Sequence, residues 1–108
     1  NPLGLQMIEE IKAKFRSGKY EYSLHAVDQS VLKGITRRDI EEAVGTGEII
    51  EDYPTDKYGP SCLILGVTAQ GRPLHIQCTH ATRERVKIIT VYEPDSAEWL
   101  DLRVRRRT

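Results

Sequence analysis

The chain has 108 residues, enough for one domain with one hydrophobic core, which we expect residues 7–108 to form. Hydrophobic residues make up 39% and charged residues 30%, and no run of like charges precedes the C-terminal tail, which excludes a disordered chain. No apolar stretch reaches the ~20 residues of a membrane helix and no signal-peptide pattern is present, so we expect a cytoplasmic protein that does not associate with membranes.

The first six residues and the distribution of charge are also informative. Residues 1–6 contain proline and glycine and precede Met7, the only methionine, so we expect them to be a remnant of an expression vector. The net charge is zero, yet residues 1–60 hold 8 Lys and Arg against 11 Asp and Glu, whereas residues 61–108 hold 8 against 5. The basic second half is compatible with a face that meets an anion.

Two helices are predicted before residue 34. Apolar residues at helical spacing, followed by Gly18, predict a helix over residues 7–17. Ser23 is expected to cap a second helix that ends at Lys33, where Gly34 supplies a left-handed exit. The predicted buried stripe of this second helix consists of Leu24, Val27 and Val31.

A third helix and four strands are predicted to follow. Thr36 and Asp39 resemble a capping box, and the short helix that they begin should break at Gly45 or Gly47. The four β-rich runs are Glu48–Tyr53, Ser61–Thr68, Pro73–Thr79 and Val86–Tyr92, joined by linkers short enough for antiparallel neighbours. With a short C-terminal helix around residues 97–102, the sequence predicts an α+β fold: N-terminal helices packed on a four-stranded antiparallel sheet.

Two histidines are candidates for proton transfer. His75 alternates with Leu74 and Ile76 along its strand, which places it on the polar face. We expect the strand to hold it on a rigid platform that is open to solvent or ligand. The alternative is an exposed sheet residue without a role. His25 falls in the first turn of a helix, where the helix dipole lowers its pKa and favours a neutral imidazole that accepts a proton, unless it only caps or packs.

No metal or cofactor is expected. Cys62, His75, Cys78 and His80 lack the paired short spacings of zinc sites. A Cys78–His75 nucleophile pair is also excluded, because the two residues alternate to opposite faces of the strand.

Several cations are candidates for binding RNA phosphates, because a guanidinium matches a phosphate in a bidentate fork. A loop that also contains His80 carries two of them, the start of the third helix carries another, and the C-terminal tail carries the rest. The alternative is a solvated loop and a solubilising tail. The candidate RNA-binding residues are Arg37, Arg83, Arg85, Arg103 and Arg105.

A series of motifs in the same order and spacing resembles a family of small bacterial and archaeal proteins defined only as domain of unknown function 4258. The motifs span nearly all of residues 7–106 and are Ser23–Gln29, Gly34–Thr36 with Asp39–Ile40, Gly47–Tyr53, Asp56–Gly59, Gly71–His75 and Lys87–Pro94. That family resembles the RelE- and MqsR-like messenger-RNA-cleaving toxins of the barnase, EndoU, colicin and RelE fold group. The resemblance implies a RelE-like domain and a cognate antitoxin, and similar proteins often resemble partners of a small zinc-ribbon antitoxin.

Residue by residue, the resemblance places the family's first histidine at His25, its strand histidine at His75, and its terminal motif at Thr90 and Tyr92. Many relatives carry a basic residue a few positions after the first histidine, on the same helix. This chain has Asp28 and Gln29 in that region.

The leading hypothesis is therefore a toxin that cleaves messenger RNA as a metal-independent endoribonuclease. Such cleavage needs a base for the 2′-hydroxyl proton, an acid for the leaving 5′-oxygen and a cation for the phosphorane charge. We assign His25 and His75 as the acid–base pair in either order, Lys87 or Arg85 as the phosphate stabiliser, and Tyr92 as a positioning residue. The alternative is a non-catalytic module that binds RNA or a protein on the same sheet, which the zero net charge favours.

Overall fold

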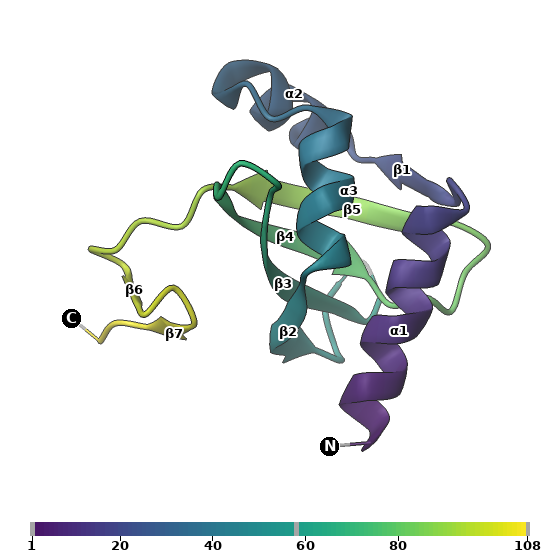
Figure 1. The fold of residues 1–108 in the computed structure, drawn as a ribbon. Helices are drawn as coiled ribbons and strands as arrows, with labels where there is room; N and C mark the ends of the chain where they lie inside the picture. The colour runs from purple at the N-terminus through teal and green to yellow at the C-terminus, as the bar shows by residue number, and fades with distance from the viewer. Residues whose placement is uncertain (1, 58, 108) are drawn as a thin grey trace.

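The computed structural model of the chain describes residues 2–57 and 59–107. It has an α+β fold with three helices, a five-stranded mixed sheet and a small C-terminal hairpin (Figure 1). The elements are α1 (Pro2–Arg16), β1 (Tyr20–Tyr22), α2 (Leu24–Lys33), α3 (Arg37–Gly45), β2 (Glu48–Tyr53), β3 (Ser61–Val67), β4 (Pro73–Thr79), β5 (Val86–Tyr92), β6 (Trp99–Leu100) and β7 (Val104–Arg105).

The strand order of the sheet is β1-β5-β4-β3-β2. The antiparallel pairing predicted for the last four strands is confirmed, with β4 in the centre between β3 and β5. The prediction of only four strands was wrong, because β1 adds a fifth and pairs with β5 in parallel, Tyr20 opposite Val86. Three residues are too few to display a strand period, so this edge strand has no clear sequence signal.

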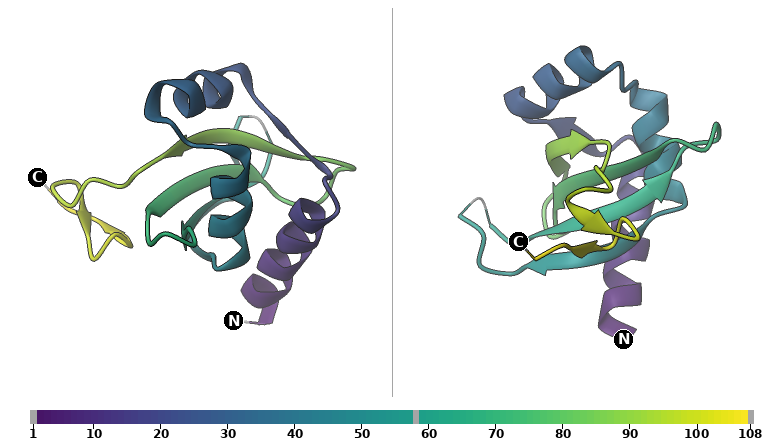
Figure 2. Two further views of the ribbon diagram at one scale, coloured as in Figure 1. Left: turned by 45° about the horizontal axis from the view of Figure 1, so that its top comes forward. Right: turned by 90° about the vertical axis from the view of Figure 1, so that its left-hand side faces the viewer.

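The hydrophobic core lies between the sheet and α1 and α3, which cover the same face (Figures 1 and 2). Residues from both helices, including Ile11 and Ile40, are fully buried against Ile64 and Ile76 of the central strands. Gly66 allows α3 to approach β3 closely, because a Cβ atom at this position would lie 1.7 Å from the carbonyl oxygen of Ala43.

The predicted helix caps are confirmed. Ser23 caps α2 by accepting a hydrogen bond from the backbone nitrogen of Ala26, and Gly34 ends the helix in the left-handed conformation. Thr36 and Asp39 form the expected capping box of α3. Helix α1 begins at Pro2 rather than at residue 7, so part of the expected vector remnant is helical.

The burial predicted for α2 was wrong. Leu24, Val27 and Val31 are exposed, and Ala26 is the buried residue of this helix. The helix lies along the edge of β5, where its inner side makes polar contacts through Ser23 and Gln29. Those contacts turn the apolar side of the helix outward.

The C-terminal helix expected around residues 97–102 was also wrong. The side chain of Asp95 accepts a hydrogen bond from the nitrogen of Ala97, but the chain turns once and becomes extended at Trp99. The β6–β7 hairpin follows, and Figure 2 shows it on the side of the sheet away from α1 and α3. A capping signal is the same for one turn as for a helix, so the sequence did not separate the two.

Among the described helices, none combines the length and the apolar character needed to span a bilayer.

Candidate functional site

The outer face of the sheet, the face opposite α1 and α3, carries most of the polar strand residues. The strand register places Glu48, Leu65, His75 and Tyr92 in one row across it. Neighbouring rows contain Glu51, Tyr53, Gln77, Thr79 and Lys87. The shared side predicted for His75, Gln77 and Thr79 of β4 is confirmed.

His75 is fully buried at the centre of this face. The ring of Trp99, from the hairpin, stands perpendicular to the imidazole with ring centroids 4.5 Å apart. The Tyr92 hydroxyl lies 3.1 Å from Nδ1, and the carbonyl oxygen of Leu102 lies 2.7 Å from Nε2. The expectation that His75 is open to solvent was wrong, because the C-terminal hairpin covers it.

These contacts determine the tautomer of His75. A backbone carbonyl only accepts hydrogen bonds, so Nε2 carries the proton and donates to Leu102. In the neutral ring, Nδ1 then accepts from the Tyr92 hydroxyl. Burial lowers the pKa of His75 and raises that of Tyr92, and both shifts favour the uncharged forms.

An acidic and a basic side chain lie beside this histidine. The Nε atom of Arg105 is 3.2 Å from each carboxylate oxygen of Glu51, and its guanidinium lies 4.7 Å from the centroid of the Trp99 ring. The Tyr53 hydroxyl donates to the same carboxylate, and burial raises the pKa of Tyr53 to about 12. We call the group His75, Tyr92, Glu51, Tyr53 and Arg105 the His75 cluster.

The hairpin that covers the cluster contains two residues in an unusual conformation. Asp101 and Leu102 have φ angles of 53° and 62°, a region that favours glycine. For Leu102, this conformation accompanies the hydrogen bond that its carbonyl oxygen accepts from Nε2 of His75. Trp99 is the only buried apolar side chain of the hairpin, since Leu100 and Val104 are exposed. The hairpin is therefore held to the sheet mainly by polar contacts and one ring.

The other predicted acid–base residue, His25, lies elsewhere. It is exposed in the first turn of α2, and within the described part of the chain it forms no hydrogen bond or ion pair. His25 and His75 are therefore not brought together. Lys87 is half-buried on the outer face. Its backbone nitrogen donates a hydrogen bond to the hydroxyl of Thr79 on the neighbouring strand.

The predicted RNA-binding arginines are dispersed over the surface. Arg37 donates to the Tyr20 hydroxyl at 2.6 Å, and Arg85 donates to the carbonyl oxygen of Gly18. Arg83 is exposed in the β4–β5 loop. Arg103 forms ion pairs with Glu48 and Asp101, and Arg105 belongs to the His75 cluster. The structure does not gather these arginines into one basic patch.

Three residues in or beside the His75 cluster were not predicted from the sequence: Glu51, Tyr53 and Trp99. Strict alternation from Ile49, which points toward α1, would place Glu51 on the core side; the register shift between these two residues turns Glu51 to the outer face instead. The contact of Trp99 with His75 depends on the path of the C-terminal segment, for which the sequence contains no local signal.

A metal site is not observed among the described residues, where no three His, Cys, Asp or Glu side chains are grouped suitably. Cys62 and Cys78 are paired across β3 and β4 in the core. The hydrogen bond with Cys62 and burial raise the pKa of the Cys78 thiol, which therefore stays protonated and unreactive.

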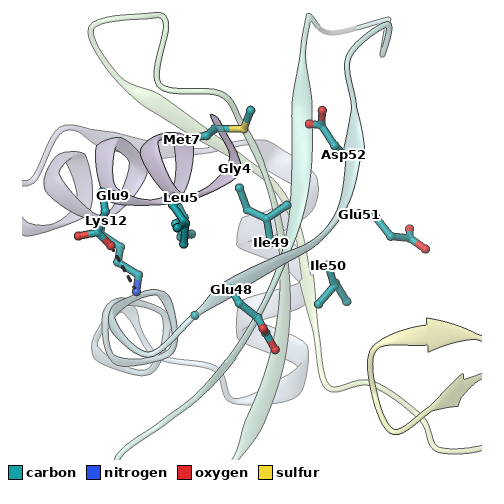
Figure 3. Close-up of a pocket in the computed structure, with 12 residues that line it drawn as sticks. Gly4, Leu5, Met7, Glu9, Lys12, Glu48, Ile49, Ile50, Glu51 and Asp52 are labelled. Carbon is teal, nitrogen blue, oxygen red and sulfur yellow. Dashed lines mark ion pairs between the residues drawn. The ribbon is translucent and has the colours of Figure 1, made fainter. Parts of the chain in front are cut away.

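A groove lies between α1 and the edge strand β2, and its volume is about 730 Å³ (Figure 3). In this view Ile49 points toward α1, whereas Glu51 points away from it. Lys12, the one cation among the described residues that line the groove, forms an ion pair with Glu9 at 3.9 Å. None of the predicted site residues lines this groove.

One comparison with known proteins gives a match. The family model named Domain of unknown function (DUF4258) matches residues 22–93, from the end of β1 to the residue after β5. No curated protein and no solved structure matches the chain. The matched region contains His25, His75, Lys87 and Tyr92, and the hairpin lies outside it.

Proposed function

The chain belongs to the DUF4258 family, and we propose that it is a metal-independent endoribonuclease that acts on single-stranded RNA through the His75 cluster. The observation that supports this proposal is the grouping of an imidazole, a carboxylate, phenol hydroxyls and a guanidinium on one sheet face. These groups supply general acid–base catalysis and charge stabilisation without a metal ion.

In the proposed reaction, a base removes the proton of a ribose 2′-hydroxyl and O2′ attacks the adjacent phosphorus. The bond to the 5′-oxygen breaks as an acid protonates that oxygen, which leaves a 2′,3′-cyclic phosphate and a 5′-hydroxyl. Glu51 and His75 are the proposed acid–base pair, and Arg105 stabilises the charge of the phosphorane. The Tyr92 hydroxyl both donates and accepts, so it positions either tautomer of His75.

The proposal requires the hairpin to move, since His75 is 0% exposed. Displacement of Trp99 and Leu102 frees Nε2, and the same movement releases Glu51 from Arg105. Local opening of a weakly held segment costs less free energy than global unfolding. The structure described here is, in this proposal, the closed and inactive form.

The resemblance to RelE- and MqsR-like toxins supports the finer part of the proposal. In that part, the substrate is messenger RNA, and the partner of the chain is a cognate antitoxin, for which the toxin resemblance offers a zinc-ribbon protein as one form. This assignment depends on likeness of motifs and fold and is separable from the chemistry of the cluster.

A second candidate function is a non-catalytic module that binds RNA or a protein. The complete burial of His75 favours it, as does the ion pair that holds Arg105, the proposed phosphorane stabiliser, on Glu51. In this alternative the His75–Trp99 contact is purely structural.

Gel analysis of a mixed-sequence single-stranded RNA in EDTA distinguishes the two. We expect wild-type protein to produce cyclic-phosphate ends, Trp99→Ala to cleave faster, and Tyr92→Phe and Glu51→Gln to cleave more slowly. Circular dichroism would establish that each variant is folded, and Glu10→Gln, on the exposed side of α1, is the matched control for a charge change.

Intact RNA with both wild type and folded Trp99→Ala would contradict the nuclease proposal and leave the binding module. Loss of cleavage in His25→Ala would instead place His25 in the mechanism, against the separation of the two histidines.

A further inference from the structure

The outward side of α2 is strongly apolar. Leu24, Val31 and Leu32 are 86%, 76% and 81% exposed, and Val27 is 42% exposed. Single exposed aliphatic residues are ordinary, but four on one ten-residue helix form a contiguous patch of the kind that marks an interaction site. We call these four residues the α2 patch.

The helix cannot roll to bury this patch. Gln29 accepts hydrogen bonds from the nitrogen of Val91 and the hydroxyl of Thr90, and the Ser23 hydroxyl donates to the carbonyl oxygen of Ile89. Ala26, between these anchors, is fully buried. Three contacts to the edge of β5 therefore hold the helix with its apolar side outward.

A carboxylate lies in the middle of the patch. At 100° per residue, Asp28 projects between Leu24 and Leu32 on the helix surface, and it also lies midway along the patch. Asp28 is exposed and has no hydrogen bond or ion pair within residues 2–57 and 59–107. Any partner that covers the patch must therefore supply a group that compensates this charge.

This position of Asp28 argues against a second copy of the chain as the partner. In a two-fold helix pair that buries the patch, the axis passes near Asp28, so the two carboxylates would face each other. Two like charges in a desolvated contact oppose association. A partner with a cation at this position has the complementary charge.

One flank of the patch has a groove for a side chain. The groove has a volume of about 320 Å³ and is lined by Tyr22, Val27, Ser30, Val31 and Arg37. The hydroxyl of Ser30 is buried and has no hydrogen-bond partner among the described residues.

We propose that the α2 patch binds an amphipathic helix of a partner protein, whose apolar face carries one Lys or Arg opposite Asp28. The apolar contacts follow the ridge of Leu24, Val27 and Val31, and the cation sets the register. This inference does not depend on the proposed nuclease activity, because neither histidine takes part.

The test is selection of a displayed library of helical peptides against the full chain, with counter-selection on a Val31→Glu variant. We expect enriched peptides to share an apolar face with one central basic residue. Their affinity should fall about tenfold or more on Val31→Glu, whereas Leu100→Glu, an exposed aliphatic change on the hairpin, should leave it unchanged.

The charge is tested with the best selected peptide and a copy in which its basic residue is Glu. Wild type should prefer the basic peptide, and an Asp28→Lys variant should prefer the acidic copy, by about tenfold in each case. Circular dichroism of each variant, compared with wild type, shows whether the fold is retained.

Four results would overturn the proposal. These are a library without enrichment, enriched peptides that lack a central cation, a wild-type dimer in sedimentation equilibrium that Val31→Glu dissociates, and binding to phosphatidylcholine–phosphatidylglycerol vesicles that Val31→Glu abolishes. The last two would identify a second copy or a lipid surface as the occupant of the patch.

Discussion

The side-chain oxygen of Gln29 lies 2.9 Å from the backbone nitrogen of Val91, and the Thr90 hydroxyl donates to the same oxygen at 2.5 Å. Strand β1 ends opposite Ile88, so beyond that residue β5 has no strand neighbour on this side. Gln29 supplies the acceptor that a neighbouring strand would otherwise provide. Gln29 therefore completes the sheet edge beyond β1.

Replacement of Gln29 tests this relationship. Gln29→Lys leaves the Val91 nitrogen without an acceptor, and we expect a loss of about 1–3 kcal/mol in the free energy of unfolding. Gln29→Glu retains an oxygen in the same place and should lose less. Urea unfolding of the three proteins measures the difference, and a Gln29→Lys protein as stable as wild type would contradict the assigned role.

The buried His75 predicts a dependence of stability on pH. Burial lowers its pKa in the folded state, so below the ordinary value near 6.5 the unfolded chain binds more protons. Its contribution to stability is therefore complete above about pH 6.5 and is lost as the pH falls. Three side chains face the ring of His75 in the folded state: Tyr92, Glu51 and Arg105. They are present whether the imidazole is neutral or protonated.

The measurement compares urea unfolding at about pH 7.5 and about pH 5.5. Wild type should lose more stability between these values than His75→Gln does. His25→Gln, on the exposed surface of α2, serves as the control and should follow wild type. Equal losses in wild type and His75→Gln would show that His75 does not carry the pH dependence.

Modification with diethyl pyrocarbonate tests how firmly the hairpin covers His75. In wild type, the exposed His25 should react quickly and the fully buried His75 slowly. Trp99→Ala removes the ring that packs on the imidazole and should raise the reactivity of His75 toward that of His25. Mass spectrometry of the digested protein locates the adducts, and Leu100→Ala, on the same strand but exposed, should have no effect.

The contact between α3 and β3 predicts opposite effects for two glycines. Gly66→Ala would place a methyl group 1.7 Å from the Ala43 carbonyl oxygen, so we expect a loss of about 3 kcal/mol or more, or failure to fold. Gly45→Ala meets nothing within 4 Å at the end of α3 and should be neutral or slightly stabilising. Thermal unfolding checks both, and a stable Gly66→Ala protein would contradict the close packing.

Local signals in the sequence predicted much of this fold. The caps at Ser23 and Thr36 depend on residues within a few positions of each other, and the four long strands were predicted as β-rich runs bounded by turn residues. The sequence did not indicate that β1 is a strand, because its three residues adopt that conformation only through pairing with β5. Contacts across more than sixty residues are not encoded in any short window.

Only part of the candidate site was predicted, because the rest depends on contacts between residues far apart in the sequence. Alternation placed His75 on the polar face of its strand, whereas the strand of Tyr92 has apolar residues in both alternating sets and gave no face; the structure joins the two side chains by a hydrogen bond. The burial of that face depends on where the C-terminal segment lies, which follows from Trp99 and from ion pairs of Arg103 and Arg105 with β2. The outward side of α2 was misjudged because amphipathic spacing shows that a helix has an apolar side, but not which side the protein covers.

The parallel pairing of β1 with β5 also constrains how the chain folds. Tyr20 stacks on Phe15 at 4.5 Å and lies beside Val86, so the N-terminal part of the core has its sheet partner only in the last strand of the sheet. During synthesis on the ribosome, α1 and β1 must wait until β5 has emerged before their aromatic side chains are covered. Such long-range closure slows folding, and fragments that stop before β5 expose Phe15 and Tyr20 to aggregation.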